Sequence, residues 1–304
     1  MTDKRRIIAL GFFDGVHIGH SALLERTLSL AKAADAIPSV ITFDAHPKSF
    51  VTGHVVPMIN SPEDRAGLFH RMFGIDDVIF LHFDRETAEM PWDEFVRLLV
   101  SDFGAIHVVA GHDYSFGHHG FGNAEMLAQK AAELGIGCDI IPEVRYKGQV
   151  SSSTLIRKLL TDGDITTANE YLGHAHVLTD VVRYGYRLGR TLGTPTINMR
   201  FDDGVLVPAH GVYATRVYID SDTPMYGVTN IGTRPTVSGG DESVTAETHI
   251  LDFRGNLYGR QVRIEFCERL RPEMKFDGVE QLREQIMKDA QAVRDYFGDT
   301  YHAQ

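Results

Sequence analysis

The stretch Gly11–His20 (GFFDGVHIGH) decides the fold of the first half of the chain. It follows Ile7–Leu10, an unbroken apolar run typical of a strand buried on both faces of a parallel sheet, and from Ser21 onward we expect a helix. A glycine-rich turn between such a strand and helix directs free backbone N–H groups and the positive end of the helix dipole at one point. The stretch therefore predicts a site for an anion such as phosphate.

Two histidines in this stretch suggest which anion is bound. His17 and His20 are three residues apart, so both imidazoles can face one pocket and donate hydrogen bonds to the phosphates of a nucleotide. Gly19 between them lets the chain approach closely. The alternative is an ordinary turn at Phe13–Gly15 followed by two solvated histidines. The density of small and imidazole residues between a strand and a helix favours the nucleotide site.

The composition limits the classes of function. The chain has 304 residues, 43% of them hydrophobic, which predicts one large or two medium domains. The formal net charge of −11 disfavours nucleic acid as a partner, because phosphate backbones are bound by basic surfaces. No apolar run reaches the roughly 18 residues of a membrane span, and we expect a cytoplasmic protein with no membrane partner. Cys138 and Cys267 lie outside any CxxC pair, which predicts core thiols.

Two patterns divide the chain. Up to about Leu172, apolar runs alternate with helical stretches, which predicts an α/β domain with a parallel sheet whose ligands bind beyond the carboxyl ends of the strands. The remaining strands are short, alternating and punctuated by Gly, Pro and Asp, as in a small antiparallel barrel. We expect domains at residues 1–174 and 175–304. A final helix is predicted, with Asp277 and Glu280 as a capping box and an apolar stripe from Val279 to Phe297.

The expected strands can be read directly from these runs. In the first domain they are Ile7–Leu10, Ser39–Thr42, Val78–Phe83, Val108–Ala110 and Cys138–Ile141. In the second domain they are Val177–Val182, Pro195–Met199, Gly211–Tyr218, Met225–Ile231, Thr245–Leu251 and Val262–Leu270.

Three more segments of the first domain carry polar residues at positions suited to a ligand. Thr42–Pro47 (TFDAHP) and Gly111–Gly117 (GHDYSFG) follow predicted strands, and Ser152–Arg157 (SSTLIR) opens a helix that can hold a second phosphate or is simply an N-capped helix. Together with GFFDGVHIGH, these segments resemble the adenylyltransferase half of bacterial bifunctional riboflavin kinase/FAD synthetases, within the nucleotidyltransferase superfamily.

This resemblance implies a Rossmann-like nucleotidyltransferase domain in which the phosphate of FMN attacks the α-phosphorus of ATP, forming FAD and releasing pyrophosphate. The nucleophile is already anionic, so catalysis consists of positioning and charge stabilisation. His17 and His20 are then catalytic, because they stabilise the transferring phosphate. The resemblance assigns the ATP of this domain to Phe13, Asp14, Gly15, His17, His20, Asp113, Ser152, Ser153, Thr154 and Arg157.

Several positions depart from the usual family pattern. Phe12 stands where Asn is usual, Ala45 where Pro is usual, and Tyr114 and Ser115 where Phe and Arg are usual; an arginine often found shortly before the SST run is replaced by Val150 or its neighbours. The lost contacts weaken adenylyl transfer unless His112, His118 or His119 substitutes for them. With Asp113, these histidines also allow a zinc site, but their irregular spacing favours a nucleotide loop.

The second domain has its own dense motif, Gly185–Met199 (GYRLGRTLGTPTINM). Its glycines permit a tight loop that can approach phosphates, and the chain contains no Walker loop. Thr196 and Asn198 alternate along the next strand and offer oxygen ligands to Mg²⁺, although any strand with a polar solvated face shows the same alternation. The motif resembles riboflavin kinase, as do the later segments GVY from Gly211, NIGTRPT from Asn230, ETHILDF from Glu247, LYG from Leu257 and LRPEMKF from Leu270.

The second resemblance implies that ATP phosphorylates riboflavin in this domain, with Mg²⁺ held by Thr196 and Asn198. Glu247 is then the base that takes the proton of the ribityl 5′-hydroxyl, which attacks the γ-phosphorus; the alternative is an exposed strand carboxylate. Arg271 and Lys275 are expected to be solvated. The resemblance assigns the flavin to Asn230, Arg234 and Glu247, and the ATP of this domain to Gly189, Arg190, Gly193, Pro195 and Thr196.

The leading hypothesis from the sequence is a bifunctional enzyme that converts riboflavin to FMN and FMN to FAD, with riboflavin, FMN and ATP as its small-molecule partners. Two alternatives stay open. The chain is a riboflavin kinase whose N-terminal module is weak or altered, or it is a non-catalytic flavin-nucleotide-binding regulator. The second alternative does not explain why His17, His20, Thr196, Asn198 and Glu247 are all present.

Overall fold

The computed structural model describes residues 4–184, 194–234 and 243–298. The chain divides into two compact units, of residues 1–153 and 154–304. The functional boundary expected at residues 174/175 stays a prediction.

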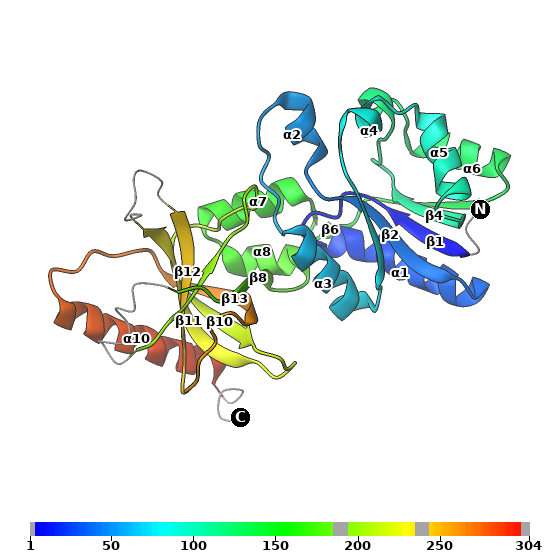
Figure 1. The fold of residues 1–304 in the computed structure, drawn as a ribbon. Coiled ribbons are helices and arrows are strands. Elements are labelled where there is room, and N and C mark those ends of the chain that lie inside the picture. The colour runs from blue at the N-terminus through cyan, green and yellow to red at the C-terminus, as the bar shows by residue number, and fades with distance from the viewer. Residues whose placement is uncertain (1–3, 185–193, 235–242, 299–304) are drawn as a thin grey trace. The chain divides into compact units, whose positions relative to one another are not determined.

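The first unit is built on a five-stranded parallel sheet with the strand order β3-β2-β1-β4-β5 (Figure 1). All residues of β1 are buried, as its unbroken apolar sequence predicts for a central strand. This order is that of a Rossmann-like sheet, in which the ligand crevice lies where the strand order reverses beside β1. The strands are β1 (Arg6–Leu10), β2 (Ile37–Phe43), β3 (Asp77–Leu81), β4 (Ala105–Gly111) and β5 (Gly137–Ile141).

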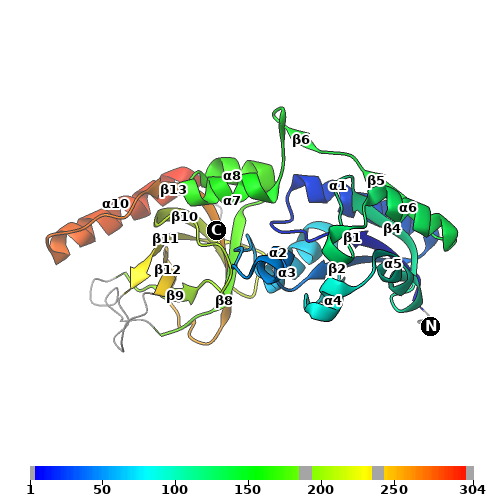
Figure 2. The same ribbon diagram turned by 90° about the horizontal axis from the view of Figure 1, so that it is seen from above.

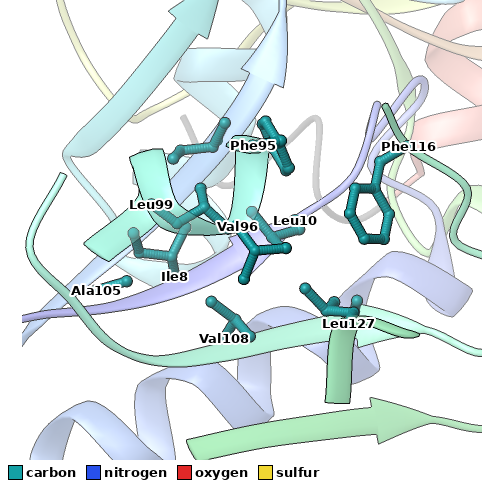
Figure 3. Close-up of a cluster of buried hydrophobic side chains, with 11 residues drawn as sticks. Ile8, Leu10, Phe95, Val96, Leu99, Ala105, Val108, Phe116 and Leu127 are labelled. Carbon is teal, nitrogen blue, oxygen red and sulfur yellow. The ribbon is translucent and has the colours of Figure 1, made fainter. Parts of the chain in front are cut away.

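Helices cover both faces of this sheet (Figure 1). On one face, Phe95 of α5 and Leu127 of α6 pack against Ile8 and Leu10 in a buried cluster (Figure 3). On the other face, α1 packs against β1, β2 and β4, and α3 packs against α1. The helices are α1 (Ile18–Ala34), α2 (Pro47–Thr52), α3 (Pro62–Phe73), α4 (Arg85–Glu89), α5 (Trp92–Ser101) and α6 (Ala124–Glu133), followed by a short hairpin of β6 (Arg145–Tyr146) and β7 (Gln149–Val150).

The second unit begins at Thr154, within α7 (Ser153–Asp162), and continues with α8 (Ile165–Leu172), which packs on the barrel that follows. The Asn169 amide donates a hydrogen bond to the carbonyl oxygen of Phe266 (2.8 Å), which ties α8 to β13. The six antiparallel strands, which Figure 2 shows from a second side, have the order β8-β13-β10-β11-β12-β9 by their hydrogen bonds. Their bounds are β8 (His176–Val181), β9 (Ile197–Arg200), β10 (Gly211–Tyr218), β11 (Met225–Arg234), β12 (Ser243–Ile250) and β13 (Gln261–Arg271).

The two edge strands of this sheet approach each other and nearly close the barrel. The backbone N–H of Arg183, just beyond β8, donates to the carbonyl oxygen of Asn198 in β9 (2.9 Å). A chain of threonine hydroxyls fills part of the interior: Thr229 lies 2.8 Å from both Thr215 and Thr248. All three threonines are fully buried, and each hydroxyl has a partner.

The final helix, α10 (Val279–Phe297), packs across β10 and β11 as predicted. Its predicted capping box is wrong, because the N-cap residue is Gly278 and no side chain caps the helix. Instead, the Gln281 side chain accepts a hydrogen bond from the backbone N–H of Asp277 (3.2 Å). The apolar stripe is buried only toward its end, at Ala290, Val293 and Phe297, whereas Val279 is 58% exposed.

His176, at the start of β8, should make the stability of the second unit sensitive to acid. It is buried, neither ring nitrogen has a hydrogen-bond partner within the described residues, and burial lowers its pKa to about 3, with a smaller effect from His174. The folded state therefore holds a neutral imidazole, whereas the unfolded chain takes up a proton near pH 6.5.

We expect the free energy of unfolding to fall by up to about 1.4 kcal/mol per pH unit from this group as the pH drops from 6.5 toward 3. His176→Leu should remove that contribution. Urea unfolding at pH 7.5 and pH 5.0 measures it in both proteins. If the free energy of unfolding depends on pH in the variant as it does in the unaltered protein, His176 is not the group responsible.

Candidate active sites

The turn between β1 and α1 has an unusual backbone. Phe13 and Val16 adopt positive φ angles of 52° and 41°, and Gly15 has a φ of 82°. Such a conformation is unfavourable for non-glycine residues and most of all for a β-branched one. Both side chains are fully buried, which holds them in place. Because the Phe13 ring is buried against Phe69 and His20, only its backbone is available to a ligand.

Hydrogen bonds fix this turn to its surroundings. Asp14 Oδ1 accepts a hydrogen bond from the backbone N–H of Ile59 (2.7 Å), and the Thr42 hydroxyl donates to the carbonyl oxygen of Phe12 (2.8 Å). The Ser153 hydroxyl, at the end of the first unit, donates to the carbonyl oxygen of Asp14 (2.9 Å). The Asp14 carboxylate and the Ser153 hydroxyl thus hold the turn, a role that their sequence motifs do not reveal.

His17 and His20 lie together, as their spacing predicts. The helix begins at Ile18, three residues earlier than expected, with His17 as its N-cap residue. The two imidazole rings stack with centroids 3.6 Å apart and planes at 17°. A Cβ atom at Gly19 would lie 2.9 Å from Cε1 of His17, so this arrangement requires glycine.

The environment of His20 keeps its imidazole neutral. Burial, and then the neighbouring His17 and Arg65, hold the pKa of His20 well below its ordinary value. His20 Nδ1 is buried, and no described residue supplies it with a hydrogen-bond partner. A neutral imidazole with an unused nitrogen at a helix start is suited to a hydrogen bond with a phosphate.

The other residues predicted for this site are more scattered. Asp113 is exposed in the loop after β4, Ser152 precedes α7, and Thr154 and Arg157 belong to α7 in the second unit. The first unit therefore brings together the histidine pair, the Phe13–Gly15 turn and Ser153. The positions of Thr154 and Arg157 relative to them stay predictions.

A cavity of about 600 Å³ that sequence reasoning missed lies in the first unit. It is of a size that holds small aromatic ligands. TFDAHP contributes one aromatic ring to it and GHDYSFG two, but no motif signals the rings supplied by α2 and by the segment after β3. Its lining includes the aromatic residues Phe43, Phe50, Phe83 and Tyr114 and the polar residues Lys48, Arg85, Ser115, His118 and His119.

Two departures from the family pattern, Tyr114 and Ser115, line this cavity, whereas a third, Phe12, does not. The replacement at Ser115 lines it together with His118 and His119, whereas His112 does not line it. The Phe12 ring lies 4.7 Å from that of His46, centroid to centroid. Within the described ranges, no three His, Cys, Asp or Glu side chains come together as a metal site would require.

In the second unit, strand register aligns the predicted polar residues. Glu247 of β12 is paired with Asn198 of β9 on one side and with Asn230 of β11 on the other. Residues directly opposite in antiparallel strands project from the same face of the sheet. These three side chains therefore form one polar row across three strands.

Two cavities lie on the two faces of β12. Glu247 and Asn230 line one of about 260 Å³, while Thr248 and Ile250 line another of about 330 Å³. Successive strand residues project to opposite faces, so the two cavities are separated by the strand itself. Thr196 lines both, and Pro195 lines the larger one.

Three predicted residues of this site cannot be placed, and only the backbone of a fourth is described. Gly189, Arg190 and Gly193 fall outside the described residues. Arg234 ends β11, paired with Ser243 through the backbone.

The family models match the two halves of the chain separately. The one described as riboflavin kinase matches residues 172–297, and the one described as FAD synthetase matches residues 1–155. A curated bifunctional riboflavin kinase/FMN adenylyltransferase from Listeria monocytogenes is 35% identical over 97% of this chain and 94% of its own. This chain belongs to that bifunctional family.

Other relatives match over the same extent. The bifunctional riboflavin kinase/FMN adenylyltransferase of Pseudomonas fluorescens is 34% identical over 95% of this chain and 92% of its own. A crystal structure from Streptococcus pneumoniae, described as a macrolide-efflux protein, is 30% identical with a TM-score of 0.84, covering 97% of this chain and 95% of its own. Among the described residues, no helix combines the length and apolar character needed to cross a membrane.

Arg271 departs from the sequence expectation that it is solvated. Its guanidinium forms a bidentate ion pair with Asp289 of α10, with Nη2 2.7 Å and Nε 3.0 Å from the carboxylate oxygens. Gln285 also donates to Asp289 (2.8 Å), and both members of the pair line the cavity that contains Glu247. Lys275 is exposed, as expected. The ion pair fastens α10 over this cavity.

Asp289→Ala should destabilise the second unit by about 3 to 5 kcal/mol, because it leaves a largely buried arginine unpaired. The double variant Arg271→Met/Asp289→Leu should recover most of this loss, since it removes both charges. Urea unfolding of the three proteins measures the effect. If the single variant is as stable as the parent protein, the ion pair does not anchor α10.

Proposed function

We propose that this chain phosphorylates riboflavin to FMN and adenylylates FMN to FAD, using ATP in both reactions. The observation that carries the proposal is that each unit has its own cluster of polar side chains suited to binding phosphate. One is the stacked pair His17 and His20 at a helix start in the first unit. The other is the Asn198–Glu247–Asn230 row beside two cavities in the second unit. Family membership supports the same pair of reactions.

In the first unit, the imidazoles donate hydrogen bonds to the phosphates of ATP while the turn from Phe13 to Gly15 supplies backbone N–H groups. A phosphate oxygen of FMN attacks the α-phosphorus, the bond to the β-phosphate oxygen breaks, and pyrophosphate leaves. No proton has to be removed from the attacking oxygen. A neutral His20 is compatible with this role, because it donates a hydrogen bond without having to titrate during the reaction.

The large cavity of the first unit is suited to the flavin of FMN. Its aromatic side chains offer flat apolar surfaces, and Lys48, His118 and His119 offer hydrogen bonds for a phosphate, whereas Arg85 is already paired with Glu89. His118 and His119 thereby compensate for the arginine that the family usually has at Ser115. This compensation favours an active adenylyltransferase over the alternative of a weak N-terminal module.

In the second unit, riboflavin occupies the cavity lined by Glu247, and ATP occupies the cavity across β12. Glu247 accepts the proton of the ribityl 5′-hydroxyl as its oxygen attacks the γ-phosphorus, and ADP leaves. Thr196 lines both cavities, so the γ-phosphate passes from one ligand to the other at this residue. Asn230, next to the base in the row, hydrogen-bonds the flavin.

The side chains of Asn198 and Thr196 fit a magnesium ion. The side-chain oxygen of Asn198 is buried and has no hydrogen-bond partner within the described part of the chain. Amide and hydroxyl oxygens are hard ligands of the kind that Mg²⁺ prefers beside phosphates. Asn198 and Thr196 would hold the ion, which neutralises phosphate charge when bound.

Separate variants should separate the two reactions. Glu247→Gln should slow FMN formation by about 100-fold or more through loss of the base, and His20→Ala should slow FAD formation from supplied FMN by about 10- to 100-fold. Each variant should leave the other reaction unchanged. Chromatographic separation of flavins after incubation with ATP and Mg²⁺ measures both.

Glu284→Gln and His54→Ala, at exposed positions of the two units, are the matched controls. Loss of both reactions in a folded single variant would refute independent sites. Accumulation of FMN alone by the unaltered protein would instead favour a kinase with an altered N-terminal module, and unchanged riboflavin would favour a binding protein.

Asn198→Ala should raise the Mg²⁺ concentration for half-maximal FMN formation by about tenfold or more, because an oxygen ligand is lost. The Mg²⁺ concentration for half-maximal FAD formation should not change. Magnesium titration of each reaction at saturating ATP makes the comparison. An equal shift in both reactions would argue against Asn198 as a ligand of the kinase metal.

A further inference from the structure

A fully buried arginine lies at the carboxyl ends of β1 and β2 in the first unit, where the ligand is expected to bind. Arg65 lies in the first turn of α3 and is 0% exposed. Its Nη1 donates to the carbonyl oxygen of Phe12 and its Nη2 to that of Phe43, both at 2.7 Å. Nη1 also donates to the Thr42 hydroxyl (3.1 Å). The guanidinium therefore bridges the carboxyl ends of β1 and β2.

In the described part of the chain, no carboxylate is in direct contact with this positive charge. The hydrogen-bond partners that the described residues supply to Arg65 are neutral. Burial lowers the pKa of Arg65 to about 10, partly offset by Asp14 and Asp44, so the group stays protonated at neutral pH. A buried charge without an ionic partner is costly to the free protein, and an arriving anion would offset that cost.

The same guanidinium acts on the turn and on the histidine pair. It lies 4.8 Å from the ring centroid of Phe12 and holds that residue's carbonyl oxygen directly before the positive-φ residue Phe13. Its charge also contributes to the lowered pKa of His20. Arg65 is thus connected both to the backbone shape of the site and to its electrostatic potential.

We propose that Arg65 is a positioning residue for adenylyl transfer, with two separable effects. Its hydrogen bonds clamp the turn after β1 against β2, and its charge draws the triphosphate of ATP to the site. This inference rests on the function proposed for the first unit. No sequence motif marks the residue, which lies in the ordinary helix start Ser61–Arg65 (SPEDR).

Two substitutions separate the clamp from the charge. Arg65→Lys keeps the charge but lacks the planar fork whose two nitrogens hold Phe12 and Phe43 at once, whereas Arg65→Gln keeps hydrogen-bond donors without the charge. For FAD formation from FMN, we expect Arg65→Gln to raise KM for ATP by about tenfold. We expect Arg65→Lys to lower kcat by about 10- to 100-fold with KM for ATP within about threefold of the unaltered protein.

FMN formation from riboflavin, measured in the same preparations, should be unchanged in both variants, as should both reactions in Arg71→Met, an exposed position of α3. Urea unfolding gives the folded fraction of each variant. A merely structural role would lower kcat in proportion to that fraction and leave KM unmoved.

The proposal is overturned if Arg65→Gln leaves KM for ATP unchanged, or if both variants share one kinetic defect. If the unaltered protein makes no FAD from FMN, the proposed function of the first unit fails as well. The unaltered protein is therefore assayed first.

Discussion

The first site depends on a turn that the backbone would not adopt without external support. Phe13 and Val16 have positive φ angles, and the contacts that hold them come from distant parts of the chain: Asp14 with Ile59, Thr42 with Phe12, and Ser153 with Asp14. Because the turn ends at His17, its shape fixes where the histidine pair stands at the start of α1. The position of the imidazoles is therefore a property of the whole unit.

The second site depends on strand register. A shift of one residue in the pairing of β12 would move Glu247 to the opposite face and exchange it with Thr248. The observed pairing instead aligns Asn198, Glu247 and Asn230, while Thr248 joins the buried threonine hydroxyls of the interior. The buried threonine hydroxyls and the row of Asn198, Glu247 and Asn230 both require this register. It keeps the two cavities on opposite faces of β12.

Local sequence predicted much of this arrangement. Apolar periodicity identified the strands of both units to within a few residues, and the spacing of His17 and His20 predicted their pairing. What it could not predict arises between segments distant in sequence. The burial of Arg65 and the Arg271–Asp289 ion pair depend on tertiary contacts that no window of sequence contains. The predicted capping box of α10 is wrong for a different reason. Asp277 and Glu280 have the right spacing, but the helix begins one residue later.

The central claim is that each unit binds its own ATP. Equilibrium dialysis with radiolabelled ATP and Mg²⁺, in the absence of any flavin, tests it most directly, because neither transfer can then proceed. We expect two molecules of ATP to be bound per chain at saturation. A single molecule per chain would contradict the central claim.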